Sequence, residues 1–405
     1  MASGEPHRDI PASSTPPLPR NVWILSWVAF FNDVSTEMSY WLLPQFLAVV
    51  LGAGPAAFGL MEGAAETVSS FGRLLSGYCS DRWRRRKPLL AAGYTVANLV
   101  KPLLAVAESW RQVFWIRFTD RAAKGFRAAP RDALIADSVD AGQRGAAFGL
   151  RQAMDSAGAI LGPLSALALL PFFHQNLRAV FWMAALPGAV SILLACWGVR
   201  EIRPAPGQEA PHAEAPPSGE VSTALRANRA SRRFMVLVAA VTLFSLGNSS
   251  DLFLVLRAQN LGVRASLAPA LGLLFNLVYT ALSWPAGWLS DRLARRWLVI
   301  LGYLVYAGVY AGFALLHGPW AVWGLFAVYG TYYALTEGAF KAWIADSVPS
   351  VSRASVYGLL NWVAGVAAFP ASLMAGWLWQ RYSPATPFAA SAILAFSAAV
   401  ILLFA

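Results

Sequence analysis

The sequence predicts an all-α membrane protein in which twelve transmembrane helices form two pseudo-symmetric six-helix bundles. The first observation is composition: 57% of the 405 residues are hydrophobic and 13% are charged, whereas about 25% of the residues in a soluble domain are charged. The second is that long apolar runs alternate with short polar segments. The third is that short motifs recur in the two halves at a nearly constant offset. Together these features exclude a water-exposed globule.

Twelve apolar runs are each long enough to cross a bilayer, which takes a helix of about 20 residues. The expected spans lie near residues 22–46, 57–79, 88–107, 112–136, 147–170, 178–199, 234–256, 266–288, 297–316, 320–344, 355–378 and 385–404. The 17 tryptophans favour the same assignment, because Trp is enriched at membrane–water interfaces.

Two polar segments divide the chain. Residues 1–20 are rich in Pro and Ser and are expected to form a disordered cytoplasmic tail. Residues 200–233 contain five prolines and several charges, and they are expected to be a cytoplasmic linker. These segments delimit an N-terminal six-helix bundle, residues 21–199, and a C-terminal six-helix bundle, residues 234–405.

Lysine and arginine mark one side of the membrane. They gather in Arg82–Lys87 after the second span, in the linker, and in Arg292–Arg296 after the eighth span. The positive-inside rule places both termini and the linker in the cytoplasm, so we expect a multi-pass protein of the plasma (inner) membrane. Because the basic residues lie in these short loops, the net charge of +11 does not indicate nucleic acid as a partner.

Motifs of enzymes and metal sites are missing from the sequence. It contains no nucleophile elbow, no phosphate-binding loop and no His/Cys box with metal-ligand spacing. The loops are also too short to hold a catalytic domain. We therefore expect neither an enzyme nor a bound metal or cofactor, and a lipid bilayer as the surroundings.

Three segments of the first half recur in the second. Residues 76–82 (SGYCSDR) correspond to 286–292 (AGWLSDR), 133–139 (ALIADSV) to 342–348 (AWIADSV), and 144–150 (RGAAFGL) to 353–359 (RASVYGL). Parallel six-span halves related by an axis along the membrane normal are a transporter architecture.

These motifs resemble those of the major facilitator superfamily, and the resemblance extends over residues 21–405. The family's loop motif Gly-x-x-x-Asp-Arg-x-x-Arg-Arg stands here as Gly77, Asp81, Arg82, Arg85 and Arg86, with a second copy at Gly287, Asp291, Arg292, Arg295 and Arg296. The Arg-x-x-x-Gly motif of span four fits Arg121 and Gly125. The antiporter motif Gly-x-x-x-Gly-Pro of span five fits Gly158, Gly162 and Pro163.

The resemblance implies a monomeric secondary transporter that gives alternating access to a central site by rocking of its halves. The span-five motif implies proton-driven export. Small residues four positions apart also let helices pack closely in lipid, so from the residues alone we expect Gly158, Gly162 and Pro163 to serve helix packing.

The repeat separates two kinds of charged residue. Charges present in both halves lie at the cytoplasmic ends of spans, and we expect them to serve the scaffold and a cytoplasmic gate. The alternative for the basic members is a topology signal alone. The predicted gate comprises Gly77, Asp81, Arg82, Arg85, Arg86, Asp291 and Arg292.

Charges of the first half that have no counterpart in the second are expected to serve a substrate or proton pathway. The candidates are Asp33, Glu37, Glu62, Glu66, Lys101, Arg121, Lys124 and Asp155. On span four, Arg121 and Lys124 belong to a charged stripe that also includes Arg117 and Asp120. Such stripes must face one another or water, because a charge facing lipid is costly.

Helix geometry predicts a network near the bilayer midplane. At about 1.5 Å per residue, Asp33, Glu66 and Arg121 fall at similar depths, with Lys101 and Asp155 as further candidate members. One interpretation is an ion-pair network that only holds the first bundle together. Buried pairs stabilise weakly, because desolvation offsets their attraction, so the number of charges favours function.

A proton-coupling hypothesis follows. A carboxylate is ionised beside a cation and protonated when it is desolvated alone, so Glu66 or Asp33 is the candidate proton carrier and Arg121 its counter-ion. This favours proton-coupled export of a small organic or amphipathic solute.

Two alternatives stay open. An organic-anion transporter would use Arg121, Lys124 and Lys101, because Arg and Lys suit carboxylate and phosphate. A membrane sensor without transport is the remote alternative. Aromatic residues of the second half, among them Tyr279 and Tyr333, are expected mostly to pack. A few, with Glu337 and Lys341, are candidates for contact with the apolar part of a substrate.

Overall fold

The computed structural model describes residues 17–83, 85–140, 143–202, 232–347 and 353–404. In these ranges the chain forms helices joined by short turns, and no strand occurs. The predicted all-α membrane fold of twelve spans in two bundles is confirmed. Most of the predicted tail and linker lies outside the described residues.

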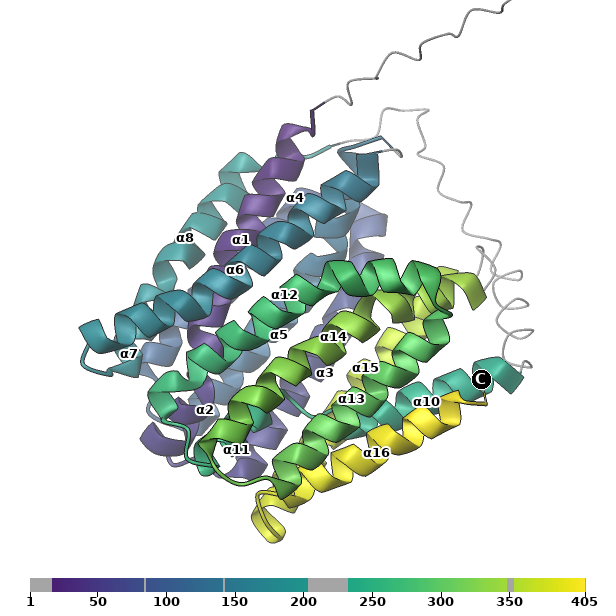
Figure 1. The fold of residues 1–405 in the computed structure, drawn as a ribbon. Helices are drawn as coiled ribbons and strands as arrows, with labels where there is room; N and C mark the ends of the chain where they lie inside the picture. Colours follow the sequence, from purple (N-terminus) through teal and green to yellow (C-terminus); the bar gives the residue numbers. More distant parts are fainter. Residues whose placement is uncertain (1–16, 84, 141–142, 203–231, 348–352, 405) are drawn as a thin grey trace, which may run out of the picture.

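The first half folds into six helical rods, some of them broken into consecutive pieces (Figure 1). In chain order they are α1 (Arg20–Tyr40) with α2 (Leu43–Gln45) and the π-helical η1 (Phe46–Val50); α3 (Pro55–Trp83); α4 (Arg86–Val100) with the 3₁₀-helical η2 (Lys101–Val106); α5 (Trp110–Asp137); α6 (Arg144–Phe172); and α7 (Leu177–Met183) with α8 (Ala185–Leu193) and η4 (Leu194–Gly198).

The second half repeats the arrangement in its described residues. Its rods are α10 (Arg232–Gly247) with α11 (Leu252–Asn260); η5 (Ala265–Leu267) with α12 (Ala268–Arg292); α13 (Arg295–Leu315); α14 (Pro319–Ser347); α15 (Arg353–Arg381); and α16 (Thr386–Leu402). Each predicted span falls on one rod. The seventh differs from the expectation of a continuous helix, because α10 and α11 are separated by a break and bent by 41°.

Matching contacts confirm that the sequence repeat is a structural repeat. Arg86 Nη1 donates to the carbonyl oxygen of Ala133 at 2.8 Å, and Arg295 Nη1 donates to that of Ala342 at 2.9 Å. Both donors and both acceptors are related by the same offset in sequence. We call the end of the bundle that carries these arginines the basic end.

The two halves touch closely at the end opposite to the basic end. Helix α3 begins there and α15 ends there, and a Cβ added to Gly59 of α3 would lie 2.2 Å from the carbonyl oxygen of Ser372 on α15. Helices α6 and α12 form a second contact between the halves (Figure 1), where Asn276 Nδ2 donates to Ala159 O at 3.0 Å. Toward the basic end, by contrast, Leu75 and Tyr78 of α3 are 58% and 67% exposed. The halves therefore part toward the basic end.

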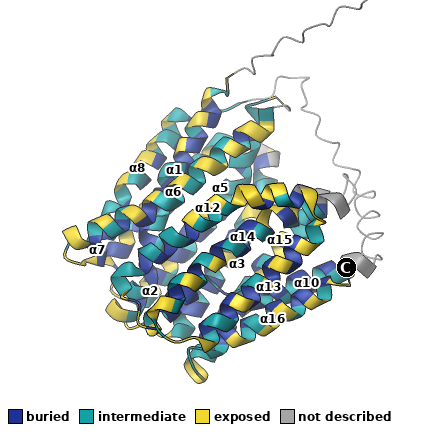
Figure 2. Cartoon of the chain, in the orientation of Figure 1, coloured by how far each residue is buried: buried dark blue, intermediate teal, exposed yellow. Residues whose placement is uncertain are grey.

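Large apolar side chains cover the outside of the bundle. Trp115, Trp197 and Trp320 are all exposed, and exposed positions follow the outer faces of the helices in Figure 2. Such a surface suits lipid rather than water. Among the described residues, six helices are long and apolar enough to span a membrane, or seven with the bent pair α10–α11. Helices α3 and α5, which carry charged stripes, are not among them.

Candidate functional site in the central cavity

A cavity of about 520 Å³ lies between the two halves. Its walls come from α1, α3 and α5 of the first half, and from α12, α14, α15 and the α10–α11 break of the second. A second space of about 600 Å³ shares part of this lining, including Asp33, Lys124 and Asn361, and extends past Arg131 and Arg151. The central cavity is therefore open toward the basic end.

Most of the predicted site residues meet in this cavity. Its lining includes Asp33, Glu37, Glu62, Glu66, Arg121 and Lys124. Lys101 and Asp155 are not part of the lining and lie in neighbouring spaces. Because charges from three helices converge on one hollow, water or a polar solute replaces lipid as their surroundings.

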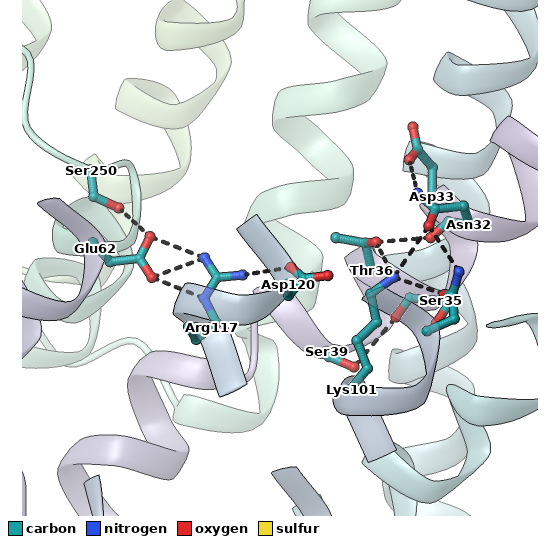
Figure 3. A network of polar contacts seen from close by, with 11 residues as sticks. Asn32, Asp33, Ser35, Thr36, Ser39, Glu62, Lys101, Arg117, Asp120 and Ser250 are labelled. Atoms are coloured by element: carbon teal, nitrogen blue, oxygen red, sulfur yellow. Dashed lines mark hydrogen bonds and ion pairs between the residues drawn. The ribbon is translucent and has the colours of Figure 1, made fainter. Parts of the chain in front are cut away.

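A buried ion pair joins α3 to α5 at the closed end of the cavity. Arg117 donates to both carboxylate oxygens of Glu62 at 2.9 and 3.1 Å, and its guanidinium also lies 3.7 Å from Asp120 (Figure 3). All three side chains are less than a tenth exposed. The network reaches the second half, because Ser250 Oγ donates to Glu62 Oε2 at 3.2 Å. Arg117 is not among the site residues predicted from the sequence, although it lies on the charged stripe of α5.

Lys101 lies behind α1 rather than in the cavity. Its ammonium group donates to Thr36 Oγ1 at 2.7 Å and to Asn32 Oδ1 at 3.5 Å (Figure 3), and also to Asn98 Oδ1 at 3.0 Å. These three oxygens satisfy the three ammonium protons. A direct contact between Lys101 and a solute in the central cavity, as the organic-anion alternative required, does not fit this position.

Arg121, Lys124 and Glu66 face the cavity without a direct ion pair among the described residues. The guanidinium of Arg121 lies over the ring of Tyr40, 5.7 Å from its centroid. Asp33 accepts a hydrogen bond from Asn32 Nδ2 at 3.0 Å, and Glu37 accepts one from Trp41 Nε1 at 2.8 Å. The expected grouping of Asp33, Glu66 and Arg121 is therefore a shared cavity lining and not a chain of direct contacts.

The second half contributes a carboxylate that the sequence analysis missed. Asp251 lines the cavity at the break between α10 and α11. It accepts hydrogen bonds from Tyr329 OH at 2.5 Å and Tyr333 OH at 3.3 Å. The predicted pathway residues are first-half charges without a counterpart in the second half. The signal for Asp251 is the converse, an acidic residue of the second half inside the seventh apolar run.

Asp155 lies nearer the basic end. It forms an ion pair with Arg151, one turn earlier on α6. Both residues line the mouth of the cavity, as do Glu337 and Lys341 of α14, which pair with each other at 3.1 Å. The mouth is thus charged on both halves.

The span-five glycines hold α6 against α1. A Cβ added to Gly158 would lie 2.7 Å from the carbonyl oxygen of Phe30, and one added to Gly162 would lie 2.6 Å from Glu37 Cβ. Pro163 is also buried in α6. Since real Cβ atoms do not approach so closely, glycine is required for this packing. The same contacts set the position of the α1 segment that carries Asp33 and Glu37.

The loop-motif residues lie at the basic end. Arg86 pairs with Asp137 of α5, and Gly77 faces Ala129 of α5. Arg82 and Arg85 are exposed, and Arg292 lies over the ring of Trp288, 3.6 Å from its centroid. The predicted roles of Asp81 and Asp291 concern side chains outside the part of the chain that the structure describes.

Most aromatic residues of the second half pack against one another, as expected. Tyr303 and Phe244 stack with centroids 3.9 Å apart, and Tyr306 and Tyr310 stack at 4.0 Å. Tyr333, by contrast, lines the cavity. Tyr279 donates to Glu337 at 2.5 Å near the mouth.

The fold and its charged cavity define a membrane transporter built of two repeated halves. The family model described as "Major Facilitator Superfamily" matches residues 25–368 and 236–405. An uncharacterised MFS-type transporter of Methanocaldococcus jannaschii is 34% identical over 393 residues, covering 96% of this chain and 95% of that protein. The chain belongs to the major facilitator superfamily and is a secondary transporter.

More distant relatives include transporters with named functions. Multidrug resistance protein MdtG of Salmonella arizonae is 23% identical, covering 85% of this chain and 82% of that protein. Sugar efflux transporter A of Dickeya chrysanthemi is 25% identical, covering 81% of each. Among solved structures, a bacterial homologue of the human lysosomal transporter Spinster aligns with a TM-score of 0.73 at 15% identity, covering 96% of both chains. At that identity the structural likeness concerns the fold alone.

Proposed function

We propose that this chain is a proton-coupled exporter of a small, polar organic solute, working by alternating access across the plasma membrane. The observation that carries the proposal is the lining of the central cavity. Asp33 and Glu66 share it with Arg121 and Lys124, and none of these four forms an ion pair in the described residues. A lipophilic cargo would call for a mainly apolar pocket, and this lining is mainly polar.

The arrangement of opposite charges supports the proposal of proton coupling. A carboxylate in a low-dielectric cavity ionises more readily beside a cation than alone. Rocking of the two halves changes the water content of the cavity and the distances between its walls. Glu66 or Asp33 would then bind a proton in one state and release it in the other, with Arg121 as the stabilising cation.

The direction of transport is inferred from the opening and from the relatives. The cavity opens toward the basic end, which the positive-inside rule places in the cytoplasm. This form would load its solute from the cytoplasm. The names of two relatives include multidrug resistance and sugar efflux, and the Gly158–Pro163 motif resembles that of proton-driven exporters.

Reconstituted vesicles test this function. Purified protein would be incorporated into liposomes, a pH gradient imposed, and uptake from a mixture of polar metabolites followed by mass spectrometry. We expect gradient-dependent accumulation of at least one solute, reduced at least about tenfold in Asp33→Asn or Glu66→Gln. Glu108→Gln is the matched control, because Glu108 is an exposed carboxylate outside the cavity. If both neutralised variants transport normally, the proton-carrier assignment is wrong.

Organic-anion transport is the second candidate. It is favoured by Arg121 and Lys124, two cavity-lining cations that make no ion pair within the described residues. Carboxylates and phosphates suit such a pair. Two results together would favour this candidate over the exporter. Organic anions would stabilise the purified protein against heat, with the stabilisation lost in Arg121→Gln, and a pH gradient would drive no flux in vesicles.

A further inference from the structure

The two signs of charge in the cavity have different partners within the protein. Glu62 is held by Arg117 and Ser250, and Asp120 lies beside the same guanidinium. Asp251, in contrast, receives two tyrosine hydroxyls and has no ion-pair partner among the described residues. Arg121 and Lys124 have none there either. Asp251 and these two cations therefore line one cavity without pairing with each other, and the first-half carboxylates Asp33, Glu37 and Glu66 share that lining.

Asp251 lies in surroundings that suit a cation. Tyr40, Phe275 and Tyr333 line the same cavity, and the rings of Phe275 and Tyr333 meet edge to face at 5.2 Å between centroids. Aromatic faces attract ammonium groups, and a neighbouring carboxylate adds a charge-assisted hydrogen bond. The described second-half lining includes no lysine or arginine that could compete for Asp251.

Arg121 and Lys124 lie farther toward the basic end. The contact of Ser250 with Glu62, and of Glu62 with Arg117, places the neighbouring Asp251 near the level of Arg117. Helix α5 runs from the closed end to the basic end. At about 1.5 Å per residue, Arg121 and Lys124 are about 6 and about 10 Å farther along the axis. The anionic and cationic positions are thus separated by the length of a small molecule.

We propose that the cavity binds a zwitterionic organic solute, with its ammonium group against Asp251 and the adjacent rings and its anionic group against Arg121 and Lys124. This inference rests on the proposed transport function and names its substrate class. A charge in a cavity without a direct ion-pair partner is costly, and a guest carrying both charges supplies a direct partner at both positions at once. A guest with one charge leaves the other position without a partner. A volume of about 520 Å³ falls in the usual range for small-molecule sites.

Matched probes test the class by equilibrium binding. The zwitterions are alanyl-phenylalanine and 5-aminovalerate. Their single-charge relatives are N-acetyl-alanyl-phenylalanine and valerate, which keep the anion, and alanyl-phenylalanine amide and pentylamine, which keep the cation. Each is added to the detergent-purified full-length protein at one pH, and melting temperature and Kd are measured. We expect at least one zwitterion to bind at least about tenfold more tightly than both of its relatives. The proposal is overturned if no zwitterion stabilises the protein, or if a single-charge relative binds as tightly.

Variants assign the two ends of the solute. In Asp251→Asn, the Kd of the preferred zwitterion should rise to that of its anion-only relative. In Arg121→Gln, it should rise to that of the cation-only relative. Glu108→Gln and Arg111→Gln alter charges outside the cavity lining, and they should leave the Kd of the zwitterion and of its single-charge relatives unchanged. If Asp251→Asn does not fold, Tyr333→Phe removes one hydrogen bond to Asp251 instead, and it should weaken binding of the zwitterion and of its cation-only relative but not of its anion-only relative. Equal weakening of all probes by the cavity variants would overturn the two-ended assignment.

The binding test is separate from the coupling test. Binding is measured without a membrane or a pH gradient, so a zwitterion that binds but is not moved by protons contradicts only the exporter. Proton-driven flux of a solute with a single charge, dependent on Glu66, contradicts only the substrate class.

Discussion

The two halves of the molecule share a scaffold but not a chemistry. Both hold the start of a helix at the basic end by the same arginine-to-carbonyl hydrogen bond, Arg86 to Ala133 and Arg295 to Ala342. In the described cavity lining, however, the first half supplies five carboxylates and four basic side chains, whereas the second supplies one carboxylate, Asp251. The contacts present in both halves support the fold. The charges present in only one half are concentrated at the cavity.

The contrast extends to equivalent positions. Arg117 corresponds at the repeat offset to Phe326, and Glu62 to Leu271 or Gly272. Phe326 and Leu271 are each 1% exposed. The second half thus fills with apolar side chains a region that the first half fills with an ion pair. Since an apolar filling is sufficient for packing there, the ion pair of the first half calls for a reason other than stability.

The largest expected effect comes from breaking this ion pair. Arg117→Leu leaves Glu62 buried without its partner, which should cost about 3–5 kcal/mol of stability, measured as a fall in the melting temperature in detergent. The double variant Glu62→Leu, Arg117→Phe gives the first half the apolar residues that the second half has at the equivalent positions. It should recover part of the lost stability. Vesicle transport should stay impaired in the double variant. Wild-type transport by a stable double variant would show that the pair is only structural.

A smaller effect is expected at the helix contact of span five. Gly162 corresponds to Ala371 and Gly158 to Ala367 at the repeat offset. The second half therefore has alanine at the two positions where the packing of α6 against α1 requires glycine in the first half. Gly162→Ala should cost about 1–3 kcal/mol by overpacking and reduce transport, because α1 carries Asp33 and Glu37. Gly149→Ala on the same helix is the control, since a Cβ there meets no atom within 4 Å. Equal melting temperatures for the two variants would contradict the close packing.

The smallest expected effect tests the shared scaffold. Arg86→Gln and Arg295→Gln each remove a charged donor to a backbone carbonyl, and Arg86→Gln also removes the ion pair with Asp137. Each should cost about 1 kcal/mol or more, and both variants should lower the melting temperature, because the carbonyl contacts are equivalent. A large loss in one half and none in the other would show that the halves do not use this contact alike.

Local patterns allowed much of the fold to be predicted. Most spans are apolar runs whose length is set by the bilayer, so the spans could be located without knowing any contact, although α3 and α5 also carry charged stripes. The seventh span was the exception, because it is a broken helix and not a continuous one. Its break at 248–251 contains Asn248, two serines and Asp251, and these polar residues fall inside the continuous span that the sequence predicts.

The site was predicted in part, and the contacts that were not predicted have a common cause. Helical periodicity and depth predicted a network of Asp33, Glu66 and Arg121, and all three line the cavity without direct contacts to one another. Periodicity did not indicate that Arg117, rather than Arg121, would pair with Glu62. Nor did it show that Lys101 would be directed to Asn32, Thr36 and Asn98 behind α1. Periodicity gives the face of one helix, but not the rotation and axial shift of its neighbour.

By itself, the sequence determined that this protein is helical, crosses a membrane, is built of two repeated halves and resembles one transporter superfamily. These properties depend on apolar length, on the distribution of charge and on motifs, all of which are local in the chain. Only the tertiary structure decided which charges pair, which face the cavity, and that Asp251 joins them from the other half. An ion pair forms or fails over a few ångströms, and helix packing, not helix periodicity, sets distances on that scale.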